Sequence, residues 1–225
     1  ILNIEKLASS IDGEILFKNV NLNLAKGDKV VVYSKDSRAT SAFYEILNGK
    51  QNALEGKFEW GVTTNQSYLP VDNQEYFDNE LTLVDWLRQY AKTEQEREEV
   101  YLRGFLGKMI FSGEEALKTS NVLSGGEKVR CMLSRMMMQR ANVLMFDEPT
   151  NHLDLESITA INNSLKNFKG TILLTTSDHE FAQTVGNRIV ELTPKGAIDR
   201  YLTFDDYMND PKIKEQREQM YAVEA

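Results

Sequence analysis

The sequence predicts an α/β fold whose core is a largely parallel sheet with helices on both faces. Three apolar runs indicate buried strands, because each is rich in branched or large apolar residues: Lys29–Tyr33, Asn142–Phe146 and Thr171–Thr175. Helical spacing follows the first run and also separates the second from the third. Strands that alternate with helices in this way are typical of a parallel sheet that is covered on both faces.

The first third of the chain adds further strands and one helix. Residues 1–33 indicate short β segments, and residues 57–70 indicate another strand pair. A loop is expected over Ser34–Ala39, followed by a helix over Ser41–Leu47 that stops at Asn48-Gly49. This segment therefore has the order strand, loop, helix.

The middle of the chain is predicted to be helical. Helical spacing runs from Leu81 to Gln139 and includes a methionine-rich stretch at Val129–Met138. Methionine commonly fills gaps in apolar cores, so we interpret these side chains as core packing. A further helix is expected over Glu156–Phe168, and the polar segment after Thr203 is expected to form an exposed tail helix.

These elements predict one main domain and a tail. The main domain spans residues 1–210, with a core formed by residues 1–72 and 140–205. A helical subdomain of about residues 73–139 is inserted into this core, and residues 211–225 form the tail helix.

Composition restricts the class of protein. The net charge of -8 argues against a generally basic surface that coats nucleic acid, although it leaves room for local basic patches. The single cysteine, Cys131, cannot form an intrachain disulfide, and we interpret it as core packing in a reducing compartment. No run of about 18 apolar residues is present, so we expect a cytoplasmic protein without a transmembrane segment of its own. Because Ile1 is not methionine, the chain is expected to be a piece of a longer polypeptide.

Two motifs carry the strongest chemical signal. The first is Leu123-Ser124-Gly125-Gly126-Glu127, directly before the methionine-rich helix. Adjacent glycines allow backbone N–H groups and a serine hydroxyl to approach an anion closely, and the helix N-terminus adds partial positive charge. A plain helix cap formed by Ser124 is the structural alternative, and the motif alone does not decide between them.

The second motif follows the strand Asn142–Phe146 and begins with Asp147-Glu148. An aspartate at the end of a buried strand is suited to hold Mg²⁺, directly or through water, and the next carboxylate can orient or deprotonate an attacking water. Taken alone, such a pair is usually a solvated strand end. The combination with the first motif favours the chemical interpretation.

The order and spacing of the two motifs resemble those of ABC ATPases, and the form Glu148-Pro149-Thr150-Asn151-His152-Leu153-Asp154 resembles the ABC-F family. The resemblance covers nearly the whole chain and implies an ABC-type P-loop nucleotide-binding domain with a parallel or mixed sheet and a helical subdomain. It also implies two such domains in one polypeptide, which bind two ATP molecules with Mg²⁺ between them, head to tail. Each site then joins the phosphate loop of one domain to the signature of the other. The resemblance further implies a role at the ribosome, with the ribosome or tRNA as partners.

The phosphate loop departs from the family pattern Gly-x-x-Gly-x-Gly-Lys-Ser/Thr. Ser34, Ser37 and Ala39 stand at the glycine positions and Thr40 at the lysine position, so only Ser41 matches. Side chains at the glycine positions hinder the backbone geometry of a phosphate cradle. Lys35 or Arg38 could supply a compensating charge, but a solvated loop cation is the expected role.

Three further positions depart from the family pattern, and each departure weakens the chain's own nucleotide site. Ile11 stands where the family places an aromatic residue against adenine, and Val71 where it places a glutamine. The switch histidine is replaced by Ser177, and the following His179 is expected to be a surface residue.

The resemblance assigns roles residue by residue. It makes Glu148 the catalytic carboxylate, Asp154 the D-loop residue, and Leu123–Glu127 the signature that contacts a partner domain's ATP. The chain's own degenerate ATP site then comprises Ser34, Ser37, Ala39, Thr40, Ser41 and Asp147, of which Ser41 and Asp147 bind Mg²⁺ weakly.

The expected function is therefore that of the second, C-terminal nucleotide-binding domain of an ABC-F protein acting in translation. The isolated chain is expected to be weak or inactive as an ATPase. Two alternatives stay open: the ATP-binding subunit of an ABC membrane transporter, and a non-catalytic interaction module that keeps the fold.

Overall fold

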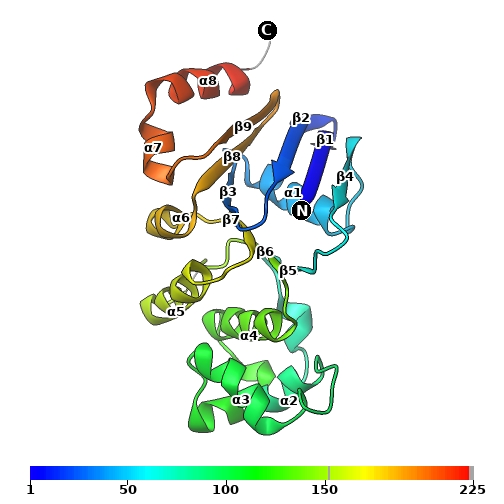
Figure 1. Cartoon of the computed structure of the whole chain (residues 1–225), viewed down its shortest axis with the longest axis vertical. Helices are drawn as coiled ribbons and strands as arrows, with labels where there is room; N and C mark the ends of the chain where they lie inside the picture. The colour runs from blue at the N-terminus through cyan, green and yellow to red at the C-terminus, as the bar shows by residue number, and fades with distance from the viewer. Residues whose placement is uncertain (152, 223–225) are drawn as a thin grey trace. The chain divides into compact units, whose positions relative to one another are not determined.

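The computed structural model describes residues 1–151 and 153–222, and Figure 1 shows its elements in chain order. It divides into two compact units. The sheet unit contains residues 1–68, 142–148 and the chain from 169 onward, and the helical unit contains residues 69–141 and 149–168. The helical unit therefore includes residues 149–168, which the sequence analysis assigned to the core. His152 of the second motif and residues 223–225 of the expected tail lie outside the described residues.

The sheet unit is built on a six-stranded sheet in the order β5-β6-β7-β3-β8-β9. Strands β6, β7, β3 and β8 run parallel, whereas β9 pairs with β8 antiparallel, so the sheet is mixed. This confirms the predicted fold class. The strands are β3 (Lys29–Tyr33), β5 (Gln66–Leu69), β6 (Val143–Asp147), β7 (Thr171–Thr175), β8 (Arg188–Thr193) and β9 (Gly196–Arg200).

A second, three-stranded antiparallel sheet in the order β2-β1-β4 belongs to the same unit. Over Val20–Leu24, strand β2 alternates buried and exposed residues, as expected for a sheet with one face on the core. The core between the sheets includes Phe17 and Phe43, whose rings meet edge to face with centroids 6.1 Å apart. The remaining elements of the unit are β1 (Leu2–Ile11), β2 (Glu14–Leu24), β4 (Glu55–Trp60), α1 (Ser37–Leu47), α6 (His179–Val185), α7 (Phe204–Asn209) and α8 (Pro211–Tyr221).

The helical unit has its own apolar core. Trp86 stacks on Phe77 with ring centroids 5.0 Å apart. Cys131, Met132 and Met136 are fully buried, which confirms their interpretation as core residues. The elements are α2 (Leu83–Arg88), α3 (Glu99–Lys108), α4 (Gly125–Met138) and α5 (Leu155–Lys166), with the short 3₁₀ helices η1 (Gln74–Phe77), η2 (Gly113–Leu117) and η3 (Ser120–Val122). None of the described helices is both long and apolar enough to cross a membrane.

One element begins earlier than predicted. Helix α1 starts at Ser37, whereas the sequence analysis expected a loop as far as Ala39 and a helix from Ser41. The reason is Asp36, whose side chain accepts the backbone N–H of Arg38 and caps the helix. The segment between β3 and α1 therefore shortens to Ser34–Asp36.

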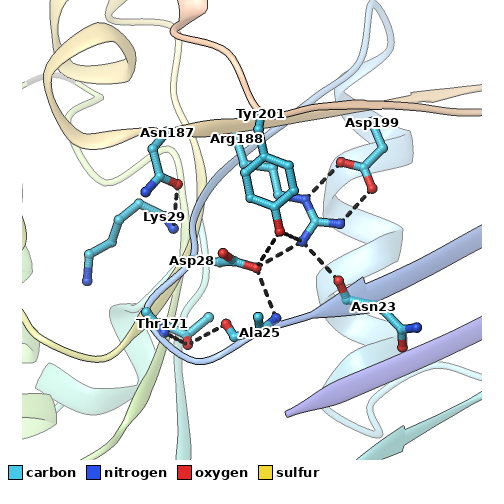
Figure 2. A network of polar contacts seen from close by, with 10 residues as sticks. Asn23, Ala25, Asp28, Lys29, Thr171, Asn187, Arg188, Asp199 and Tyr201 are labelled. Atoms are coloured by element: carbon cyan, nitrogen blue, oxygen red, sulfur yellow. Dashed lines mark hydrogen bonds and ion pairs between the residues drawn. The ribbon is translucent and has the colours of Figure 1, made fainter.

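A polar network fixes the amino-terminal ends of the parallel strands (Figure 2). The buried guanidinium of Arg188 donates to both carboxylate oxygens of Asp199, at 2.8 and 2.6 Å, and to Asp28 Oδ2 at 2.9 Å. Tyr201 donates to the same Asp28 oxygen at 3.2 Å. Because Asp28 precedes β3 and Ser34 follows it, this network lies at the end of β3 opposite to the Ser34–Asp36 segment.

Candidate functional site

Three adjacent parallel strands bring the predicted site residues of the sheet unit to one edge. β6 ends at Asp147, β7 ends at Thr175, and β3 ends at Tyr33 before the Ser34–Asp36 segment. Carboxyl ends of neighbouring parallel strands meet at the same edge of a sheet, which is where α/β proteins place ligands.

Ser41 and Asp147 are brought together at this edge. Ser41, on α1, donates its hydroxyl to Asp147 Oδ2 at 2.6 Å. Burial, with the nearby carboxylates of Glu148 and Glu45, raises the pKa of Asp147 to about 6, although the hydrogen bond from Ser41 opposes the shift. The carboxylate is therefore ionised at neutral pH. A hydroxyl and a carboxylate supply the hard oxygen atoms that Mg²⁺ prefers as ligands.

Glu148 is held in an uncommon backbone conformation beside Ser177. Its φ is 53°, in the left-handed region that non-glycine residues seldom occupy. The Glu148 N–H donates to Thr175 O at 2.7 Å, which holds the backbone there. Oε2 of Glu148 accepts the backbone N–H of Ser177 at 2.9 Å and its hydroxyl at 3.2 Å. The expected catalytic carboxylate and the expected switch position are thus in direct contact.

Four backbone N–H groups of the phosphate-loop segment already have acceptors within the chain. Those of Arg38 and Ala39 bond to Asp36 Oδ1 and O, both at 3.0 Å. The N–H of Asp36 bonds to Ser34 Oγ at 3.2 Å, and that of Lys35 to the Tyr221 hydroxyl at 3.1 Å. A phosphate cradle needs N–H groups that converge on an anion. This segment presents a carboxylate at the helix N-terminus instead.

The side chains of the segment do not replace the missing lysine. Thr40 is buried and its hydroxyl donates back to Ser37 O at 3.0 Å. Arg38 pairs with Asp36 at 2.7 Å and with Glu14 at 3.1 Å. The hydrogen bond from Arg38 also lowers the pKa of Asp36, which keeps that carboxylate charged.

Helix α8 reaches this segment, a contact that the sequence analysis did not foresee. The expected tail helix is present, but its inner side packs on β8. Glu191 of β8 is fully buried and accepts from Arg217 Nε and from the Tyr221 hydroxyl, both at 2.6 Å. The ammonium of Lys35 lies over the Tyr221 ring, 4.6 Å from its centroid. Because 186 residues separate Lys35 from Tyr221, no local signal could have revealed the pair.

We expect Tyr221→Phe to loosen the Ser34–Asp36 segment. The substitution removes the oxygen that accepts the Lys35 N–H, and a hydrogen bond of about 1 kcal/mol corresponds to roughly fivefold faster exchange of that amide. Hydrogen–deuterium exchange resolved at Lys35 measures the effect. Tyr101→Phe in the helical unit serves as the control. Unchanged exchange at Lys35 would show that the Tyr221 contact does not hold the segment.

The signature loop of the helical unit forms a complete capping box. Ser124 caps α4, with its Oγ accepting the Glu127 N–H at 3.2 Å. The Ser124 N–H donates to Glu127 Oε1 at 3.1 Å, and Glu127 pairs with Lys118 at 2.8 Å. The structural alternative, a helix cap, is therefore present. It leaves the hydroxyl proton of the exposed Ser124 available to a ligand, since the cap uses the oxygen only as an acceptor.

The two glycines of the loop have different surroundings. A Cβ at Gly126 would lie 3.2 Å from Leu153 Cδ2 and 3.4 Å from Ser157 Oγ, whereas a Cβ at Gly125 would meet no atom within 4 Å. Asp154 caps α5 by accepting the Ser157 N–H at 2.7 Å, a bond that lowers its pKa. Gly126 therefore packs on the turn that contains Asp154, while Gly125 faces open space.

This difference predicts opposite effects on stability. Gly126→Ala should lower the free energy of unfolding by about 1 kcal/mol, because crowding of Leu153 by the methyl group outweighs the better helix propensity of alanine. Gly125→Ala should raise it by up to about 0.5–1 kcal/mol, since alanine is the better helix former. Urea unfolding of both variants and the wild type measures the two signs. Equal effects would contradict the packing described here.

Leu123 of the signature loop is buried, whereas the other remaining predicted positions lie at the surface. Ile11 is 40% exposed and Val71 is 55% exposed. His179 is exposed, as predicted, and its Nε2 contacts the carboxylate of Asp205.

Comparisons with known proteins bear on the family and the fold. A model of the ABC transporter family matches residues 4–151. The structure of the dimeric ATP-binding cassette MJ0796 in a post-hydrolysis state, bound to ADP and Pi, superposes with a TM-score of 0.73 at 21% identity. The superposition covers 90% of this chain and 99% of the MJ0796 chain. This likeness establishes the fold.

Two curated relatives are longer than this chain. The uncharacterized ABC transporter ATP-binding protein YkpA of Bacillus subtilis (strain 168) is 49% identical over 223 residues, which are 99% of this chain and 41% of that protein. ABC transporter F family member 5 of Arabidopsis thaliana is 24% identical over 204 residues, which are 89% of this chain and 29% of that protein. The chain thus spans less than half the length of these relatives.

Proposed function

Since this chain belongs to the ABC transporter family, we propose that it is one nucleotide-binding domain of a two-domain ABC-F ATPase. Its role is to supply the signature loop to ATP held by the other domain, while its own phosphate-loop position binds nucleotide poorly. The observation that carries this proposal is the contrast between the two loops. The N–H groups of Lys35, Asp36 and Arg38 are occupied within the chain, whereas the signature loop has open space at Gly125, where a Cβ would meet no atom within 4 Å.

The chain's own site fits Mg²⁺ better than it fits a phosphate. Ser41 and Asp147 offer suitable oxygens 2.6 Å apart. The Asp36 carboxylate, however, stands at the N-terminus of α1, where an anionic phosphate would have to lie. We therefore assign no catalytic step to nucleotide bound at this position.

The donated loop has the groups that such a role needs. The Ser124 hydroxyl can donate to a phosphate oxygen, and the N-terminus of α4 adds partial positive charge beside Gly125, where a Cβ would meet no atom within 4 Å. Donors fixed in place before the reaction stabilise developing negative charge at little reorganisation cost. Asp154, which caps α5, is the residue expected to meet the other domain beside this loop.

The ABC-F assignment rests on the second motif and on the similarity to ABC transporter F family member 5 of Arabidopsis thaliana. We propose that the whole protein acts in the cytoplasm on the ribosome or tRNA. The second candidate is the ATP-binding subunit of a membrane transporter, which the name of the B. subtilis relative favours. A permease gene beside this one would support transport, whereas a second cassette in the same reading frame would support ABC-F. A purely structural module is disfavoured by the left-handed backbone of Glu148, because such strain gathers at functional sites.

Calorimetric titration of the 225-residue chain with ATP and Mg²⁺ tests the weak site. We expect no saturable binding up to millimolar ATP and no release of phosphate. Micromolar affinity with turnover would contradict the proposal, because it would require a working phosphate cradle in this chain.

A further inference from the structure

We propose that a lysine-lined hollow on the sheet unit binds phosphate groups of an RNA backbone. The hollow has a volume of about 610 Å³ and is lined by Lys6, Lys18, Asn19, Glu55, Pro194 and Lys195. These residues come from β1, β2, the start of β4 and the β8–β9 turn, which lies beside β2 in Figure 1. None of them belongs to the Ser41–Asp147 pair or to the signature loop.

The charges of the hollow are unbalanced. Among the described residues, Lys6, Lys18 and Lys195 form no ion pair, and Lys195 Nζ donates only to the backbone oxygen of Gln219, at 3.2 Å. Glu55 is the one carboxylate in the lining. Three lysines that line one hollow give it a positive potential, which favours a bound anion. In a chain of net charge -8, this concentration of positive charge is local.

Two residues of the hollow, Lys6 and Asn19, have uncommon backbone conformations. Lys6 has φ 48° and Asn19 has φ 53°, at irregularities where β1 and β2 pair. Asn21 bridges the two positions: its Oδ1 accepts the Lys6 N–H at 3.0 Å, and its Nδ2 donates to Asn19 O at 3.3 Å. β4 is close as well, since a Cβ at Gly56 would lie 2.2 Å from Lys6 O. Lys6 and Asn19 therefore lie on a rim that hydrogen bonds within the sheet hold in place, and strained backbone of this kind is retained where it serves a site.

The chemistry of the hollow suits phosphate. An ammonium group is a compact charge with three donors, so three of them can share the unesterified oxygens of one or two phosphates. The choice of RNA as the source of phosphate rests on the proposed function at the ribosome. The preference for phosphate itself rests on the hollow alone.

Fluorescence anisotropy with a labelled 20-nucleotide single-stranded RNA tests the proposal on the 225-residue chain. We expect binding that weakens from 50 to 200 mM KCl with a logarithmic slope of about 2, as three phosphate contacts imply for a single strand. The triple variant K6Q/K18Q/K195Q should bind at least tenfold more weakly, with a slope near zero. The matched control K166Q/K169Q/K212Q removes the same charge from exposed lysines elsewhere and should leave affinity nearly unchanged.

The outcomes separate the alternatives. An equal loss of RNA affinity in both triple variants would overturn the proposal. Unchanged RNA affinity in K6Q/K18Q/K195Q would overturn it as well. Unlabelled pyrophosphate that displaces RNA from the wild type supports phosphate recognition at the hollow. Pyrophosphate binding without RNA binding would overturn RNA as the source. Circular dichroism of each variant verifies folding. Because the assay contains no ATP, its result is independent of whether the ATP titration supports the proposed function.

Discussion

Ser124→Arg should reduce the ATPase activity of the complete two-domain protein by about 100-fold or more, the usual scale for losing a fixed donor to developing negative charge. Ser124 is the exposed N-cap of α4, next to the open side of Gly125. An arginine side chain there fills the space in which the other domain's nucleotide would lie. It also removes the serine hydroxyl, which is the one side-chain donor of the loop in this position.

The same substitution has a smaller structural cost that must be separated from the effect on activity. Losing the Ser124 cap costs about 1 kcal/mol of stability. Ser112→Arg is a matched control, because Ser112 is exposed, lies in the same unit and makes no side-chain capping bond. Steady-state phosphate release and thermal unfolding should be measured on both variants. A large activity loss in Ser112→Arg as well would show that added charge, not position, is responsible.

Thr40→Ala provides the contrasting measurement. Thr40 stands at the lysine position of the phosphate loop, but it is buried and bonds back to Ser37 O. We expect its removal to change turnover by less than about twofold, since one neutral hydrogen bond within a helix contributes about 1 kcal/mol to stability and nothing to a bound nucleotide. A loss comparable with that of Ser124→Arg would mean that the local site hydrolyses ATP.

The strands that are buried on both faces could be predicted closely from the sequence. Lys29–Tyr33 and Thr171–Thr175 have the predicted bounds. A continuous apolar run of this length fits a strand that is buried on both faces of a parallel sheet, so its ends mark the ends of the strand. β8 did not stand out, since it contains Arg188 and Glu191. Both are buried only because distant partners satisfy them, and sequence spacing does not reveal such partners.

The contacts of the candidate site also differ in how far the sequence predicts them. The Ser41–Asp147 and Glu148–Ser177 contacts join positions that the family pattern had already marked. Asp36 was missed although its signal was local: an aspartate directly before a helical run is a common N-cap. The sequence analysis expected a loop as far as Ala39, and helix capping by Asp36 determined the structure instead.

Asp147→Asn should stabilise the protein above pH 6 while weakening any Mg²⁺ site. The folded-state pKa of Asp147 is about 6, above the value of about 3.9 expected for an unfolded chain. Between these values the folded state keeps a proton that the unfolded state has lost. The free energy of unfolding therefore falls as the pH rises through this window, and the full penalty is present above it.

Asparagine has nearly the same shape as aspartate and carries no charge, so it removes this penalty and can still accept the hydrogen bond from Ser41. We expect a gain on the order of 2 kcal/mol at pH 7.5 that disappears below about pH 4, where both side chains are neutral. Thermal unfolding across this pH range measures the difference, and Asp12→Asn in an exposed turn is the control. A gain that does not depend on pH would arise from packing and would refute the electrostatic cause. A pH-dependent gain would show that the fold retains a buried carboxylate at a cost in stability, which indicates that Asp147 is kept to bind a ligand rather than to support the sheet.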